Sequence, residues 1–347
     1  MSVEAIRIGL TGAFSGPHTT HTAQMKWGAL LATREWESRH ASPVRVIVGD
    51  EQAEAEKAPT VAKHLIDEQV QGVIGHFSSG CALAAAPLYR EAGIPLLAPA
   101  STHPDLSQWD HIFRLCARDD QVSRVMGEWA ARHFHPQRVG LLDDGSVYGK
   151  TLMDYTFQTL TKLGISSGIR LEWPKEDTAN GKDSLCSLIE QADPEVILFG
   201  GRSRAAADMT RTLRQQGINL PLVFGDDVLN AEFLDQTAEA SRNVWIVGSI
   251  PPSRNGRTAS FFDAYRREVG TDPGFYAAST YLATEILLQA LVQDDWADKG
   301  YGLLQARTWE TLLGEQSFDA DGNLRAVSLG LWKVEPGRIL LSDRFEL

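Results

Sequence analysis

The stretch Arg7-Ile-Gly-Leu-Thr-Gly-Ala-Phe-Ser-Gly16 joins a short apolar strand pattern to a loop of glycine and serine, and a helical pattern follows over residues 23–38. The stretch Arg138-Val-Gly-Leu-Leu-Asp-Asp-Gly-Ser-Val-Tyr-Gly149 repeats this order of strand, loop and helix later in the chain. The repetition predicts two related units rather than one large sheet.

Each half also contains a second strand that ends in a similar loop. These stretches are Val73-Ile-Gly-His-Phe-Ser-Ser-Gly80 and Val196-Ile-Leu-Phe-Gly-Gly-Arg-Ser203. Doubly wound sheets bind ligands at the carboxyl ends of strands, where the strand order reverses. We therefore expect the four loops to line a ligand cleft formed by two facing sheet edges.

Short aliphatic runs alternate with longer helical patterns along most of the chain, which predicts an α/β fold with helices on both faces of parallel sheets. The predicted strands are Ile6–Leu10, Val44–Val48, Gly72–Ile74, Leu96–Ala98, Arg138–Leu142, Glu195–Phe199, Leu222–Phe224 and Val244–Val247. The predicted helices are Ala23–Ser38, Pro59–Glu68, Gln121–Arg132, Leu152–Leu163, Ala205–Gln216, Ala259–Glu268 and Tyr276–Gln293, and an alternating apolar run follows at Ser328–Val334.

Composition excludes several classes of function. The formal net charge of -12 over 347 residues argues against a nucleic-acid surface, which needs clustered Lys and Arg. No apolar run approaches the roughly 20 residues of a membrane span, so we expect a chain that does not itself span a membrane. The three cysteines form no CxxC pair, and the start of the chain lacks the pattern of a secretory signal. The chain is therefore expected to be either cytoplasmic or a mature form.

The first group of candidate ligand residues is Ser78-Ser79-Gly80 together with Ala100-Ser101-Thr102, after two consecutive strands. Hydroxyls and backbone N–H groups at helix N-termini bind carboxylates. A single serine in such a place is more often only a helix cap. Two such loops on consecutive strands favour a carboxylate site.

A second group follows other predicted strands or begins helices. Asp227, in the pair Asp226-Asp227, follows a strand and can pair with a ligand ammonium, although a solvated turn is the alternative. Tyr148, Tyr276 and His21 stand at loop–helix junctions, where aromatic side chains more often serve core or hinge packing.

Enzymatic motifs are missing from the sequence. Ser79 has no GxSxG context, and neither a GxGxxG nor a Walker loop is present. The pair His133 and His135 lacks a third metal ligand, and Asp319-Ala-Asp-Gly-Asn323 lacks the glutamate that ends a calcium loop. We therefore expect no catalytic residue, no cofactor and no metal.

The order of the motifs resembles the leucine/isoleucine/valine-binding protein family, the type I solute-binding proteins of ABC importers. The landmarks are Gly12–Pro17, Val73–Ser79, Gly93–Thr102, Asp143 to Gly149, Gly200-Gly201 and Thr280-Tyr281. The resemblance implies two Rossmann-like lobes that are joined by three crossings and close on an amino acid. It implies a first lobe of residues 1–120 plus 250–329 and a second of 121–249 plus 330–347.

The resemblance also implies roles for residues. Ser79, Ala100 and Thr102 match positions that hold the ligand's carboxylate and amino group, and Ser78 and Ser101 lie beside them. Tyr148 matches an aromatic of the second lobe, and Asp227 matches the acidic residue for the amino group. Tyr276 matches an aromatic wall, and His21 stands where the family has Tyr.

Three departures from the family pattern are visible. Arg202 stands where the aliphatic binders place an aromatic beside the ligand, which favours an acidic, polar or differently oriented ligand such as a γ-amino acid. The alternative is that Arg202 pairs with a protein carboxylate such as Asp226 and does not contact the ligand. Ala53 and Ser78 replace the cysteines of the family's early disulfide, and the usual signal peptide is missing.

The leading prediction is thus a periplasmic binding protein that captures an amino acid or related small zwitterion by hinge closure and delivers it to an ABC importer membrane permease. The alternative is a cytoplasmic sensor of the same fold that binds short amides or carboxylates. An enzyme on a similar scaffold is disfavoured because the sequence has no catalytic constellation.

Overall fold

The structure, a computed structural model, describes residues 5–16, 18–174 and 181–347. The chain forms two compact units. The first unit comprises Met1–Cys116 and Pro251–Val327, and the second comprises Ala117–Ile250 and Ser328–Leu347, so the chain passes from one unit to the other three times. Pro17, at the end of the first sequence landmark, lies outside the described residues.

The first unit is built on a five-stranded parallel sheet whose strand order is β2-β1-β3-β4-β5. The side chains of its central strands are buried on both faces, as the unbroken aliphatic runs require. The strands are β1 (Ile6–Gly12), β2 (Val44–Asp50), β3 (Val73–Ile74), β4 (Leu96–Ala98) and β5 (Ile112–Arg114).

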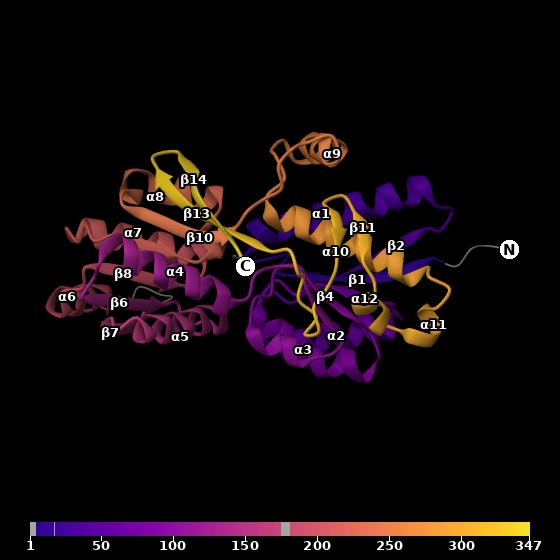
Figure 1. Cartoon of the computed structure of the whole chain (residues 1–347), viewed down its shortest axis with the longest axis horizontal. Helices are drawn as coiled ribbons and strands as arrows, with labels where there is room; N and C mark the ends of the chain where they lie inside the picture. Colours follow the sequence, from indigo (N-terminus) through magenta and orange to yellow (C-terminus); the bar gives the residue numbers. More distant parts are fainter. Residues whose placement is uncertain (1–4, 17, 175–180) are drawn as a thin grey trace. The chain divides into compact units, whose positions relative to one another are not determined.

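Helices cover both faces of this sheet. α1 (Thr19–Arg39) and α10 (Phe275–Leu291) pack together on one face, and α2 (Ala58–Asp67) and α3 (Ser79–Glu91) on the other (Figure 1). The remaining elements of the unit are α9 (Ala259–Val269), α11 (Trp296–Lys299), α12 (Gly302–Ala306), a two-stranded sheet of β11 (Trp309–Thr311) and β12 (Gly314–Gln316), and the short helix η1 (Pro104–Gln108).

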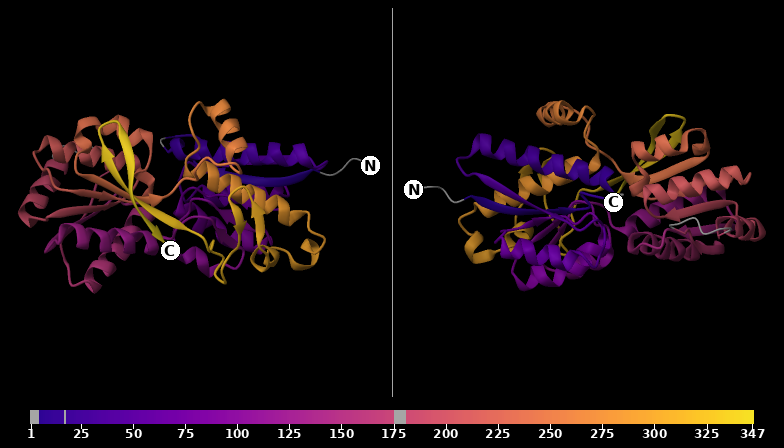
Figure 2. Two further views of the ribbon diagram at one scale, coloured as in Figure 1. Left: turned by 45° about the horizontal axis from the view of Figure 1, so that its top comes forward. Right: turned by 180° about the vertical axis from the view of Figure 1, so that it is seen from behind.

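The second unit is built on a seven-stranded sheet of order β14-β13-β10-β9-β8-β6-β7. The five strands from β6 to β10 are parallel, and an antiparallel hairpin of β13 and β14, yellow in Figure 2, extends the sheet beside β10. The strands are β6 (Arg138–Asp143), β7 (Ser166–Glu172), β8 (Val196–Gly200), β9 (Leu222–Phe224), β10 (Val244–Ser249), β13 (Ser328–Glu335) and β14 (Arg338–Glu346).

The helices of the second unit form two packed groups. α4 pairs with α5, where the Ser123 hydroxyl donates to the Leu152 carbonyl at 2.7 Å, and α7 pairs with α8. None of the helices in residues 5–16, 18–174 and 181–347 has the length and apolar character needed to cross a membrane. The helices are α4 (Asp119–Phe134), α5 (Val147–Lys162), α6 (Gly181–Ala192), α7 (Ser203–Gln215) and α8 (Ala231–Thr237), with the short helices η2 (Asp226–Val228) and η3 (Ala238–Ser241).

The two units share one strand order. In both, the parallel strands are arranged second-first-third-fourth-fifth along the sheet, so the order reverses between β1 and β3 and again between β6 and β8. The four Gly/Ser loops singled out in the sequence follow these four strands. Each unit therefore presents two of the predicted ligand loops at its own switch point, where doubly wound sheets bind ligands.

Candidate functional site

The loop after β3 leads directly into helix α3 in the first unit. Ser78 is the N-cap residue of α3 and has an extended backbone, yet its side chain makes no capping hydrogen bond. Ser79, in the first turn, is buried, and its hydroxyl oxygen accepts the Thr102 backbone N–H at 3.3 Å. That bond joins the loops that follow β3 and β4, and it leaves the Ser79 hydroxyl hydrogen able to donate to a carboxylate.

The loop after β4 contributes Ala100, Ser101 and Thr102, all buried. The Ser101 hydroxyl donates to the His76 carbonyl at 2.7 Å, so its one hydrogen is engaged within the protein. The Ser101 carbonyl accepts from the Arg114 Nε at 3.2 Å. Ser101 thus connects the loop after β4 to the loop after β3.

An aromatic cluster lies beside these loops. The ring centroids of His21 and Tyr276 are 4.4 Å apart, and those of Phe77 lie 5.7 Å from His21 and 5.9 Å from Tyr276. Ala100 and Met25 complete the cluster. His21, Tyr276 and Ala100 were predicted from the sequence, whereas Phe77 was not, although it directly precedes the Ser78-Ser79 pair.

In the second unit, helix α5 positions Tyr148 in its first turn. Ser146 caps the helix by accepting the Gly149 N–H at 3.0 Å. The Tyr148 hydroxyl donates to the Asp226 carboxylate at 2.7 Å. Burial, and after it the negative charges of Asp226, Asp119 and Asp227, raise the pKa of Tyr148 well above its ordinary value. Asp119 was not predicted from the sequence, because its position at the start of α4 does not follow a predicted strand.

Asp227 and Arg202 lie at the ends of neighbouring strands in the second unit. One Asp227 carboxylate oxygen accepts the Ser203 N–H at 2.8 Å, at the start of α7. Arg202 is the N-cap residue of α7 and is half-buried, and its backbone N–H donates to Asp144 at 2.9 Å. Asp144 therefore ties the loop after β6 to the loop after β8.

Two sequence landmarks have a steric explanation here. A Cβ on Gly149 would lie 2.5 Å from the Gly200 carbonyl oxygen, and one on Gly201 would lie 2.7 Å from the Asp144 carboxyl carbon. Both distances are shorter than any real contact permits. Glycine is thus required for the start of α5 to approach the end of β8.

The ten predicted ligand residues divide unequally between the units and differ in charge. Uncharged hydroxyl groups and aromatic rings dominate the set in the first unit, whereas in the second unit Tyr148 experiences the negative charges of Asp226, Asp119 and Asp227. The first set is His21, Ser78, Ser79, Ala100, Ser101, Thr102 and Tyr276, and the second is Tyr148, Arg202 and Asp227.

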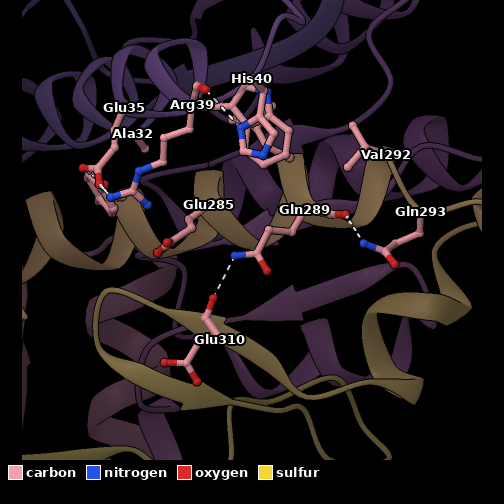
Figure 3. A pocket seen from close by; sticks show the side chains of 12 residues that line it. Ala32, Glu35, Arg39, His40, Glu285, Gln289, Val292, Gln293 and Glu310 are labelled. Carbon is pink, nitrogen blue, oxygen red and sulfur yellow. Dashed lines mark hydrogen bonds and ion pairs between the residues drawn. The ribbon is translucent and has the colours of Figure 1, made fainter.

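A pocket of about 340 Å³ opens elsewhere on the first unit, between α1, α10 and β11 (Figure 3). Its polar lining includes Glu35, Arg39, Glu285 and Glu310, and it contains none of the ten predicted residues. In the described part of the chain, no group of three or more His, Cys, Asp or Glu side chains is arranged to hold a metal ion. The Asp319–Asn323 segment forms a turn in which the Asp319 carboxylate accepts the backbone N–H groups of Asp321 and Asn323.

Comparison with known proteins identifies relatives over the whole chain. The Leu/Ile/Val-binding protein homolog 1 of Brucella abortus (strain 2308) is 26% identical over 344 residues, which cover 96% of this chain and 91% of the relative. The structure of LivJ, the branched-chain amino acid transporter substrate binding protein from Streptococcus pneumoniae in complex with isoleucine, aligns with a TM-score of 0.86 at 22% identity and covers 99% of this chain and all of LivJ.

A solute binding protein of an ABC transporter from R. palustris, solved with benzoate, aligns with a TM-score of 0.85 at 16% identity, over 98% of this chain and 96% of that protein. These similarities confirm the predicted α/β fold of two doubly wound lobes. The sequence profile of the periplasmic binding protein family matches residues 5–328. The prediction of a non-enzymatic binding protein is confirmed on this ground: the chain belongs to the periplasmic binding protein family.

Proposed function

We propose that this chain is the substrate-binding protein of an ABC importer and that it captures an amino acid or a related small zwitterion. The Ser79 and Thr102 loops of the first unit bind the ligand carboxylate, and Tyr148 and Asp227 of the second unit bind its ammonium. The ligand stabilises a closed state through its contacts with both units. The similarity to the Brucella Leu/Ile/Val-binding protein homolog and to the Streptococcus protein in complex with isoleucine supports an amino acid as ligand.

The negative field around Tyr148 is the observation that carries this proposal. Burial raises the pKa of the Tyr148 hydroxyl most, and the negative charges of Asp226, Asp119 and Asp227 raise it further. The Tyr148 hydroxyl donates to Asp226 at 2.7 Å, and carboxylates grouped in this way favour an ammonium beside them. A benzoate-like ligand, which the R. palustris protein holds, has a carboxylate but no ammonium. The acidic second unit therefore favours a zwitterion over a simple aromatic acid.

Arg202 narrows the ligand class further. Arg202 and Asp227 follow the neighbouring strands β8 and β9. The planar guanidinium of Arg202 can bind a second acceptor group on the ligand, because its N–H groups match the geometry of a carboxylate. We propose an acidic, polar or γ-amino compound rather than a plain aliphatic amino acid. In an Arg202→Tyr variant, affinity for that compound should fall at least tenfold, while weak affinity for leucine appears.

Calorimetry and thermal shift with L-glutamate, γ-aminobutyrate, L-leucine, benzoate and butylamine test the proposal. At a hundred times its dissociation constant, a true ligand adds about 2.7 kcal/mol to the free energy of unfolding. We expect a zwitterion to stabilise the protein, with benzoate and butylamine inactive. Tight binding of benzoate with every zwitterion silent would overturn the proposal.

Asp227→Asn tests the ammonium role with little change of shape, because the asparagine oxygen can still accept the Ser203 N–H. Affinity for the zwitterion should fall about tenfold or more, since a charge-assisted hydrogen bond is lost. The matched control is Asp235→Asn, an exposed residue of α8. Equal affinities for the two variants would remove Asp227 from the site.

The same proposal places the protein in the periplasm, with a membrane permease as its partner. Membership of the periplasmic binding protein family supports this location. The location can be tested by fractionating cells that express the natural gene. The protein is then detected with an antibody in the periplasmic and cytoplasmic extracts. Recovery in the cytoplasmic extract would favour a sensor of the same fold.

A further inference from the structure

A row of three titratable side chains is buried under the ligand loops of the first unit. Glu51 follows β2, His76 follows β3, and Tyr89 lies in α3; all three are fully buried. The His76 Nδ1 is 3.5 Å from a Glu51 carboxylate oxygen, and the His76 Nε2 is 3.3 Å from the Tyr89 hydroxyl. The imidazole therefore links the end of one strand to the helix that follows the next.

Burial makes Glu51 depend on His76. Among the residues that the structure describes, neither Glu51 carboxylate oxygen has a hydrogen-bond partner, and the imidazole is the group of opposite potential charge beside it. A buried carboxylate is very costly without compensation, and the imidazole of His76, 3.5 Å away, is the neighbouring group that can provide it. Removal of either side chain leaves the other one buried without its neighbour.

The backbone around the pair leads to the ligand loops. The Glu51 N–H donates to the Gly12 carbonyl at 3.3 Å, and the His76 carbonyl accepts the Ser101 hydroxyl. His76 stands three residues before Ser79, whose hydroxyl accepts the Thr102 N–H. The loops after β1, β2, β3 and β4 are thus connected through Glu51, His76 and Ser101.

We propose that Glu51 and His76 are positioning residues that hold the Ser78-Ser79 loop in the arrangement that binds the ligand carboxylate. The pair does not touch the ligand; it fixes the backbone from which Ser79 projects. The importance of the loop for binding rests on the function proposed above, but the fixing of the loop by the pair can be tested without a ligand.

The test combines amide hydrogen exchange with calorimetry on the full chain. Glu51→Gln keeps the shape of the side chain and removes its charge, so the amides of residues 75–82 should exchange at least tenfold faster. The dissociation constant for the best of L-glutamate, γ-aminobutyrate and L-leucine should rise at least tenfold. His76→Gln should have the same two effects. If this variant does not fold, because the Glu51 carboxylate stays buried without the imidazole, the double variant Glu51→Gln/His76→Gln removes that carboxylate and gives the same readout.

His111→Gln is the matched control. His111 is also fully buried in the first unit, but it precedes β5 at the opposite edge of the sheet, and burial lowers its pKa to about 4. Exchange at residues 75–82 should remain unchanged in this variant. Unchanged exchange in Glu51→Gln, or an equal rise in His111→Gln, would overturn the proposal. If no probe binds the wild-type protein, the proposed function fails while the exchange comparison still decides the positioning role.

Discussion

The hydrogen bond from the Thr102 N–H to the Ser79 hydroxyl makes these two residues act together. Replacement of both by Ser79→Ala and Thr102→Val removes two hydroxyl donors and changes little volume. Each hydrogen bond to a charged group is worth roughly 1.5–3 kcal/mol, so affinity should fall about a hundredfold or more. Calorimetry measures the loss, and Ser38→Ala, on an exposed part of α1, is the control. An unchanged dissociation constant would show that the hydroxyls serve only the fold.

Glu285, in the pocket of Figure 3, provides a prediction about pH. Burial raises its pKa from 4.5 to about 7, and the Leu312 N–H, which donates to it at 2.9 Å, opposes the shift. The folded chain holds this proton more tightly than the unfolded chain does. The resulting stabilisation is complete below pH 4.5 and is lost as the pH rises to about 7.

Glu285→Gln should therefore unfold with a free energy on the order of 2 kcal/mol higher than the wild type at pH 8, and the difference should shrink toward pH 4.5. Urea unfolding across this pH range measures it. Glu315→Gln, an exposed residue of β12 outside the pocket, is the control. A difference for Glu285→Gln that stays constant with pH would contradict the raised pKa.

Single residues were predictable where a strand pattern pointed to them. Ser79, Thr102 and Asp227 follow aliphatic runs, and the carboxyl ends of parallel strands meet at one sheet edge. Glu51 and Phe77 were not found, because their significance comes from side chains that are distant in sequence. The hydrogen bond from the Ser101 hydroxyl to the His76 carbonyl could not be predicted either, because the partner of a hydroxyl group depends on how the side chains pack.

At the scale of elements, the contact of α1 with α10 depends on one glycine. A Cβ on Gly28 would lie 2.2 Å from the Ala277 carbonyl oxygen, an atom that cannot rotate away. Alanine ordinarily favours a helix over glycine by up to about 1 kcal/mol. In Gly28→Ala the cost of the steric overlap should exceed this gain in helix propensity, so the variant should be less stable than the wild type by about 1–3 kcal/mol.

Urea unfolding measures this effect, and Gly302→Ala is the matched control. A Cβ on Gly302, at the start of α12, would meet no atom within 4 Å. That variant should be neutral or slightly more stable than the wild type. If both substitutions act alike, the close approach of the two helices does not limit stability.

Elements were predictable where an unbroken apolar run stood between turn residues. The strands Leu96–Ala98 and Leu222–Phe224 were predicted with their observed bounds, since each is an apolar run with turn residues nearby. β5, Ile112–Arg114, is equally short but ends in the charged Arg114, so it gives no aliphatic run. β7 lies at the edge of its sheet, and its mostly polar sequence SSGIRLE gives no aliphatic run.

At the scale of the whole molecule, the C-terminal hairpin belongs to the second unit. β13 is largely buried and pairs with β10, whereas β14 forms the edge of the sheet and is largely exposed. A chain that ends at Glu335 should therefore stay folded with a lowered melting temperature. A chain that ends at Val327 should lose the second unit, because β10 becomes an unpaired edge beside an open core.

Limited proteolysis with mass spectrometry distinguishes the two truncations. For the chain that ends at Val327, sites in residues 117–250 should become accessible to protease. The chain that ends at Glu335 should keep most of its protection there. Equal protection of residues 117–250 in both chains would show that β13 is dispensable for the second unit.

The discontinuous make-up of the units has a consequence for biosynthesis. When the ribosome has made residue 250, α1 still lacks α10, and β10 still lacks β13. The first core can close only after residues 251–327 have emerged, and the second only after residues 328–335. Both units of the nascent chain thus lack a packing partner until translation is almost finished, and any chaperone that meets the chain before then meets it with both cores incomplete.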